Sequence, residues 1–99
     1  MKDLDKVFKK NTELAWRIID NETMIIPLDE QTVDTEKIEV LNPTATCIWE
    51  LINGENTLKE IIEKICEEYE IEYEEAEKEV LGFIRDLRNK NLITLGGER

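Results

Sequence analysis

The sequence predicts an α+β fold in which a three-stranded antiparallel sheet is followed by three helices. Two observations predict it. Before Asn42, short runs of strand-forming residues alternate with polar breaks, whereas after Asn42 apolar residues recur at helical spacing almost to the end of the chain. The length of 99 residues suits one domain with a single core.

Three segments of the first half have the composition of β-strands. Leu14–Ile19 and Thr23–Leu28 are joined by the turn-forming residues Asp20–Glu22. Lys37–Leu41 alternates polar and apolar residues, as a strand with one solvated face does, and it follows a polar loop at Asp29–Thr35. Short links between successive strands imply an antiparallel meander, which has free edges.

The second half begins with two helices. Asn42 is suited to cap the first helix and Pro43 to its first position, while Gly54 ends that helix or the turn after it. The apolar face of this helix consists of Ala45, Ile48, Trp49 and Ile52. Thr57 and Glu60 form a capping box at the start of the second helix. The apolar face of the second helix consists of Leu58, Ile61, Ile62, Ile65, Cys66 and Tyr69.

A third helix is predicted to begin near Glu74 or Glu75, since acidic residues suit the positive end of the helix dipole. Its apolar face consists of Ala76, Val80, Phe83, Ile84 and Leu87, with Leu81 beside it. Asn91 tolerates the left-handed backbone that stops a helix, and Leu92–Leu95 has the composition of a short terminal strand.

The chain is predicted to divide into an N-terminal arm at residues 1–13, a domain at residues 14–95 and a frayed tail at residues 96–99. In the arm, Leu4, Val7 and Phe8 have helical spacing, but the segment is too short for a helix that is stable alone. Three outcomes stay open for it: packing as an arm, pairing with another copy, or remaining loose.

The balance of charge limits the partners of the chain. With 24 acidic and 13 basic residues, the net charge is −11, which on average repels a phosphate backbone and an anionic membrane. The sequence has no signal peptide and no transmembrane window, so we expect a cytoplasmic protein. Cys47 and Cys66 match no redox or zinc spacing, and we expect them to be buried, reduced thiols.

The sequence lacks the residue patterns of an active site. It contains no histidine, which is the commonest general base, and no glycine-rich phosphate loop. Most acidic residues fall on the exteriors of predicted helices, and Glu67–Glu70 lacks the alternating ligands and the central glycine of a calcium loop. We therefore expect no enzymatic activity, no cofactor and no metal site.

Short helices followed by a terminal strand also allow a winged helix-turn-helix-like fold, and therefore a DNA-binding regulator. The third helix has three cations near one stripe, namely Lys78, Arg85 and Arg88. The acidic residues of the same helix and the net charge argue against this alternative. A dimeric structural adaptor, pairing through a sheet edge or the N-terminal arm, is the other alternative.

An ordered set of short motifs is similar to a known family. Leu41–Ala45 resembles its L-N-x-T-A step from the third strand into the first helix, and Ile48–Leu51 and Gly54–Thr57 follow. Further matching positions are Trp16, Glu60, Ile61, Tyr69, Val80, Phe83 and Leu87. The set extends from about Leu14 to Ile93 and resembles the PqqD-like family, also called the RiPP recognition element, RiPP meaning a ribosomally made and later modified peptide.

The resemblance implies a winged-helix-like fold and a non-catalytic function in peptide recognition. The leader of a precursor peptide would add as a strand beside the third strand, in a groove lined by the third helix. The partners would be that precursor and a maturase, often a radical S-adenosylmethionine enzyme, in the synthesis of pyrroloquinoline quinone or another RiPP. The free edge of Lys37–Leu41 suits this mode, because an edge offers unpaired N–H and C=O groups.

The peptide-binding residues that this mode implies come from one strand and one helix. Those of the strand are Lys37, Ile38, Glu39, Val40 and Leu41. Those of the helix are Lys78, Val80, Phe83, Ile84, Arg85, Leu87 and Arg88. At least two of the four apolar helix residues should be core instead, and the three cations could equally pair with nearby glutamates. Trp16 and Trp49 are expected in the core.

Two departures from the family pattern affect these expectations. Asp29–Lys37 is longer and more acidic than a tight hairpin needs, which leaves the register between the second and third strands open. Asn91 stands where the family often has glycine, a change with little effect because asparagine tolerates left-handed geometry.

A gel-shift experiment with duplex DNA at moderate salt tests the regulator alternative. We expect no retardation, because a chain with a net charge of −11 gains little from releasing phosphate counterions. A retarded band that grows with protein concentration would favour the regulator.

Overall fold

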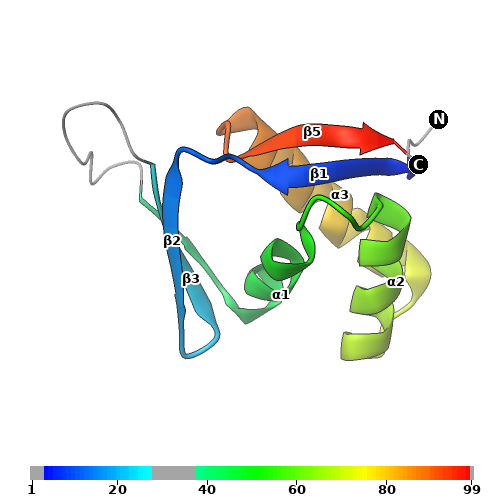
Figure 1. The fold of residues 1–99 in the computed structure, drawn as a ribbon. Coiled ribbons are helices and arrows are strands. Elements are labelled where there is room, and N and C mark those ends of the chain that lie inside the picture. The colour runs from blue at the N-terminus through cyan, green and yellow to red at the C-terminus, as the bar shows by residue number, and fades with distance from the viewer. Residues whose placement is uncertain (1–3, 28–37, 99) are drawn as a thin grey trace.

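A computed structural model describes residues 4–27 and 38–98, and it confirms the α+β class, with a three-stranded antiparallel sheet followed by three helices. The elements in chain order are β1 (Lys6–Lys10), β2 (Leu14–Ile19), β3 (Glu22–Pro27), β4 (Glu39–Leu41), α1 (Pro43–Leu51), α2 (Leu58–Tyr69), α3 (Tyr73–Asn89) and β5 (Ile93–Glu98). Figure 1 shows the three-stranded sheet at one end of the molecule and a separate β1–β5 ribbon lying across the helices.

The three-stranded sheet has the order β2-β3-β4 with antiparallel pairing throughout, so the predicted meander is confirmed. Leu14 is paired with Pro27 at one end, and Thr23 is paired with Leu41 in the second ladder. The third strand begins only at Glu39, and Ile38 directly precedes it. Lys37 and the predicted loop at 29–35 lie outside the described residues.

The N-terminal segment, which the sequence left open, is a strand. β1 is antiparallel to β5, with an irregularity in register between Val7 and Phe8. The extra residue, Gly96, lies on β5, because Val7 pairs with Gly97 and Phe8 with Leu95. Val7 and Phe8 are both buried; Phe8 packs in the hydrophobic core, whereas Val7 bridges to Thr57. Adjacent apolar residues therefore resembled a helical pattern. The division of the chain into arm, domain and tail stays a prediction, although β1 packs into the fold.

β5 continues to Glu98, beyond the predicted end of the terminal strand at Leu95 and through the tail that was expected to fray. Pairing with β1 explains the difference, because the ladder satisfies the backbone of both segments. Gly96 suits this pairing, since a Cβ there would approach the Val7 carbonyl oxygen to 3.3 Å.

The predicted helix caps are present. The Asn42 side-chain oxygen accepts a hydrogen bond from the Ala45 amide at 2.8 Å. The Glu60 amide donates to Thr57 Oγ1 at 3.2 Å, and the Thr57 amide donates to Glu60 Oε1 at 2.8 Å, which completes the capping box. Asn91 has φ of 60°, the left-handed conformation expected after α3. α3 itself begins at Tyr73, slightly earlier than predicted.

The core lies between the helices, the inner face of the three-stranded sheet and β1. Its largest fully buried apolar side chains are Trp49, Ile25, Ile52, Ile61, Ile62, Ile65 and Val80. One buried polar contact connects the sheet to α1: Thr23 Oγ1 donates to Thr46 Oγ1 at 2.7 Å, and Thr46 Oγ1 donates to the Leu41 carbonyl at 3.3 Å. These bonds satisfy groups that would be costly to bury alone.

Two expectations about the core are wrong. Trp16 is 43% exposed: it lies on the edge strand β2, where it meets Trp49 edge-on, with ring centroids 5.9 Å apart, and the Lys10 ammonium covers part of its ring. Cys47 and Cys66 are half-buried rather than buried.

Lys10 connects β1 to α1. Its ammonium group donates to the Ile52 carbonyl at 2.7 Å, at the end of α1, and lies 5.0 and 5.1 Å from the ring centroids of Trp16 and Trp49. Burial lowers the pKa of Lys10, and the Glu50 carboxylate opposes part of that shift. A cation suits this place because the end of a helix presents free carbonyl groups.

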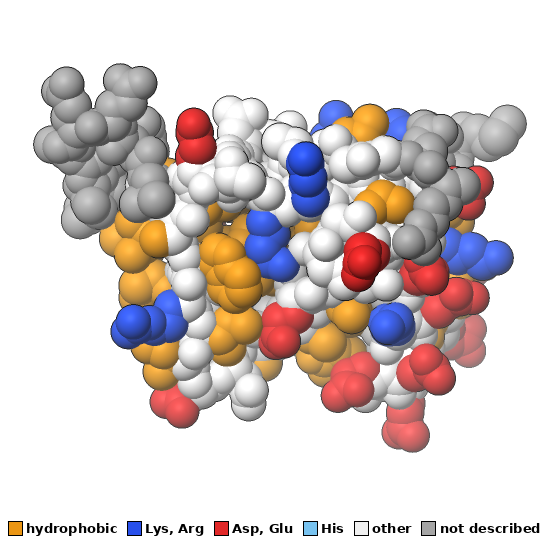
Figure 2. Space-filling model, in the orientation of Figure 1, with side chains coloured by type: hydrophobic (Ala, Val, Ile, Leu, Met, Phe, Trp, Pro, Cys, Tyr) orange, Lys and Arg blue, Asp and Glu red, His pale blue; other side chains and the backbone are white. Residues whose placement is uncertain are grey.

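Acidic and apolar side chains gather at different places on the face of the molecule drawn in Figure 2. Figure 2 shows acidic side chains over α2 and hydrophobic side chains around β2 and β3. Large apolar residues exposed on the sheet are Trp16, Ile19, Met24 and Val40. No helix of the described residues is long and apolar enough to cross a membrane.

The burial of Phe8 predicts that β1 stabilises the whole domain. Phe8→Ala should lower the free energy of unfolding by about 3–5 kcal/mol, because a side chain that is 2% exposed leaves a cavity. Urea denaturation followed by circular dichroism measures the loss. Phe8→Leu should cost less than about 1.5 kcal/mol, and it remains measurable if the alanine variant does not fold.

The matched control is Leu95→Ala on the same ribbon, where the side chain is 48% exposed and its removal should change stability by less than about 0.5 kcal/mol. Equal effects of the Phe8 and Leu95 truncations would contradict the packing described for β1.

Candidate functional site

β4 is an edge strand. It pairs with β3 on one side, and no described strand pairs with its other side. Val40 is 61% exposed, whereas Leu41 is buried and holds the strand to the core. Glu39 forms an ion pair with Lys90 at 2.9 Å, which connects β4 to the residue after α3. Both side chains of this pair are partly solvated, so it positions the strand more than it stabilises the fold.

A groove of about 410 Å³ lies between the start of α1 and α3. We call it the β4 groove, because Asn42 on its wall directly follows the last residue of β4. Its lining residues are Asn42, Thr44, Ala45 and Ile48 beside Lys78, Glu79, Gly82, Phe83 and Asp86. The open strand edge and the groove are therefore continuous along the chain.

Gly82 leaves room in this groove. It lies in the interior of α3, where glycine costs about 1 kcal/mol relative to alanine. A Cβ built at Gly82 would have no heavy atom within 4 Å, so no neighbour among the described residues requires the glycine. The missing side chain keeps the wall of the groove low, as close approach of another backbone requires.

The structure divides the predicted binding residues into three sets. Those at the β4 edge or in the groove are Ile38, Glu39, Val40, Leu41, Lys78 and Phe83. Val80, Ile84 and Leu87 are buried, which confirms that at least two of the four apolar helix residues are core. Arg85 and Arg88 line a different pocket on the other flank of α3, together with the small exposed part of Ile84. Lys37 is outside the described residues.

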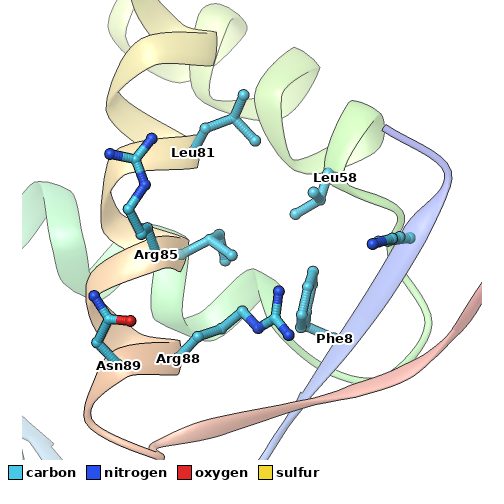
Figure 3. Close-up of a pocket in the computed structure, with 8 residues that line it drawn as sticks. Phe8, Leu58, Leu81, Arg85, Arg88 and Asn89 are labelled. Atoms are coloured by element: carbon cyan, nitrogen blue, oxygen red, sulfur yellow. The ribbon is translucent and has the colours of Figure 1, made fainter. Parts of the chain in front are cut away.

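The second pocket, which we call the arginine pocket, has a volume of about 480 Å³. Figure 3 shows Leu81 and Arg88 on α3 directed toward Leu58 of α2 and Phe8 of β1, while the Arg85 side chain runs along α3 at the rim. Its full lining is Lys6, Phe8, Leu58, Leu81, Ile84, Arg85, Arg88 and Asn89. No residue lines both this pocket and the β4 groove.

Sequence reasoning missed two residues of these surfaces. Gly82 could have been found, because it is a glycine inside a strongly amphipathic helix and away from its apolar face. Phe8 could not, because its place beside α3 depends on the pairing of β1 with β5 across almost the full length of the chain.

The described residues offer little reactive chemistry. They include no cluster of three or more His, Cys, Asp or Glu placed to hold a metal ion. Burial raises the pKa of the Cys47 thiol, the carboxylates of Glu68 and Glu50 raise it further, and a hydrogen bond with Tyr69 opposes them. A thiol held protonated in this way is a poor nucleophile.

A small α+β domain with an open strand edge beside a helix-lined groove is an arrangement to which an extended peptide can add as a strand. The family model described as "Coenzyme PQQ synthesis protein D (PqqD)" matches residues 17–93, which include half of β2 and all of β3, β4 and the three helices. The chain therefore belongs to the PqqD family.

A solved structure described as "TbiB1 in Complex with the TbiA(beta) Leader Peptide" is similar to this chain. The TM-score is 0.73 and the sequence identity 27%, and the likeness covers 92% of this chain and 98% of that chain. No curated protein sequence matches.

The open space at Gly82 predicts a gain in stability on substitution. Gly82→Ala should raise the free energy of unfolding by about 0.5–1 kcal/mol, because alanine restricts the unfolded chain and clashes with nothing. Gly54→Ala is the control, and it should destabilise the protein by about 1 kcal/mol or more because φ is +81° there. Urea denaturation measures the free energy of unfolding of both variants. A loss of stability in Gly82→Ala would mean that another atom fills the space beside Gly82, against the open groove described.

Proposed function

We propose that this chain binds the leader of a ribosomally made precursor peptide, as an added strand beside β4, and presents it to a separate modifying enzyme. The observation that supports this most directly is the open edge of β4, which is followed in the chain by Asn42 on the wall of the β4 groove. Membership of the PqqD family supports it, and so does the likeness to TbiB1, whose structure is described as a complex with a leader peptide.

The short edge cannot supply the binding energy alone. β4 has three residues, and a few net backbone hydrogen bonds contribute about 2–4 kcal/mol in total. Micromolar affinity corresponds to about 8 kcal/mol. The remainder has to come from side chains of the peptide that enter the β4 groove, where Ala45, Ile48 and Phe83 provide apolar surface.

The charges of the β4 groove are mixed. Lys78 lines it together with Glu79 and Asp86, so the groove is not a general site for acidic peptides. We infer that apolar side chains of the leader enter beside Phe83, while Lys78 pairs with a single carboxylate. The main-chain bonds come from residues 37–41. Val80, Ile84 and Leu87 support the groove from the core.

The modifying enzyme supplies the chemistry in this proposal, and the chain itself acts without catalysis. A maturase of the radical S-adenosylmethionine type is the partner that we propose, in the cytoplasm where precursor peptides are made. The product would be pyrroloquinoline quinone or another modified peptide. DNA binding receives no support, because the acidic side chains of α2 extend over one face of the domain (Figure 2).

The test is an NMR titration of the ¹⁵N-labelled chain with the leader of its own precursor. We expect micromolar or tighter binding, with the largest amide shifts at residues 38–41 and at Lys78, Gly82 and Phe83. Gly82→Trp fills the groove with a bulky side chain and should weaken binding by at least about tenfold.

Glu63→Trp is the matched control, because it introduces the same side chain at an exposed position on α2. It should bind the leader as the unaltered chain does. If the leader binds without changing the amide chemical shifts of β4, the proposed strand addition is wrong. Sedimentation at several protein concentrations shows whether the chain forms a homodimer. A homodimer that uses the β4 edge would compete with the leader for that edge.

A further inference from the structure

The arginine pocket has a cationic rim on an acidic protein. Acidic residues outnumber basic ones by 24 to 13, yet the charged residues that line this pocket are Lys6, Arg85 and Arg88. Among the described residues, neither arginine forms an ion pair with a carboxylate. Lys6 interacts with another group, so the two guanidinium groups are the cations that a ligand would meet at this rim. They make this rim attractive to anionic groups.

The floor of the arginine pocket is apolar and rigid. Phe8, Leu58 and Ile84 are 2%, 5% and 4% exposed, so core packing holds each of them in place. The Arg88 guanidinium lies 5.4 Å from the centroid of the Phe8 ring, a cation–π contact that restricts the long side chain before any ligand arrives (Figure 3). A restricted arginine loses less entropy on binding a carboxylate.

We propose that the arginine pocket is a docking site for an acidic segment of the modifying enzyme. Carboxylates of that segment pair with Arg85 and with Arg88, and a neighbouring apolar side chain packs on Phe8 and Leu81. Charge complementarity favours an acidic partner, and the apolar floor favours a protein over a free anion. This inference rests on the proposed function, since it requires an enzyme to which the peptide is presented.

The position of the pocket on α3 argues for the enzyme rather than the precursor. The pocket and the β4 groove lie on opposite flanks of α3 and share no lining residue. A leader seated along β4 therefore leaves the arginine pocket open. A module that presents a bound peptide has to contact both molecules at once, and two separate surfaces on one helix allow this.

The first experiment uses a blocked synthetic peptide, Glu-Leu-Glu-Phe-Glu, as the probe in an NMR titration of the ¹⁵N-labelled chain. We expect amide shifts at Phe8, Leu81, Arg85 and Arg88. The glutamine counterpart, Gln-Leu-Gln-Phe-Gln, should bind at least about tenfold more weakly, because the charge-assisted bonds are lost. No shift at these residues up to millimolar peptide would overturn the proposal.

Variants identify the residues responsible. The double variant Arg85→Gln, Arg88→Gln should lose probe binding and keep its leader affinity, and both side chains are exposed, so the fold should be retained. Arg17→Gln on β2 is the matched control, and it removes a cation from an exposed position outside the pocket. Equal loss of probe binding in the control would show a non-specific charge effect and overturn the proposal.

A final titration adds the probe after saturation with the leader. Undisturbed probe binding, with leader shifts confined to β4 and its groove, supports separate surfaces for the two partners. If the leader itself shifts the pocket residues and displaces the probe, the arginine pocket belongs to the precursor and the docking proposal fails, while the proposed function stands. If the leader does not bind but the probe does, the proposed function fails instead, and the arginine pocket remains a site for acidic segments.

Discussion

The burial of a single face of α3 is the contact on which both candidate surfaces depend. Ala76, Val80, Ile84 and Leu87 fix the helix against the core, so its two flanks are left to form walls. One flank meets the start of α1 and forms the β4 groove, and the other meets β1 and α2 and forms the arginine pocket. Because interiors are close-packed, a shift of this face would alter both surfaces together.

The join between sheet and helices determines how the open edge is presented. Leu41 ends β4, Asn42 caps α1, and the buried bonds through Thr46 hold α1 to β3 and to the last residue of β4. These bonds pair the buried hydroxyl groups of Thr23 and Thr46 and so fix the turn from strand to helix. A peptide added at the β4 edge would meet a turn that is already ordered.

The distribution of charge divides the surface by partner. A net charge of −11 repels anions on average, so Lys78, Arg85 and Arg88 are local exceptions that can attract particular anionic groups. Lys78 lies in a groove of mixed charge, whereas Arg85 and Arg88 lie over an apolar floor. The lysine and the two arginines therefore serve different selectivity on the two flanks, because an ammonium is a point charge and a guanidinium is a planar group that also stacks on an aromatic ring.

Local patterns in the sequence determined the helices, their caps and the three-stranded meander, because periodicity, N-caps and the Thr57–Glu60 box act over a few residues. Of the candidate site, the β4 edge, Lys78 and Phe83 could be predicted from the sequence, and a family resemblance indicated strand addition as the mode of peptide binding.

The contacts between distant segments were decided by the tertiary structure. β1 and β5 became a ribbon only by pairing with each other, and Trp16 stays 43% exposed because Lys10 and the edge of Trp49 cover its ring only in part. The separation of Arg85 and Arg88 from Lys78 has the same cause: a helix places all three near one stripe, and only the packing of β1 beside α3 puts the arginines in a pocket of their own.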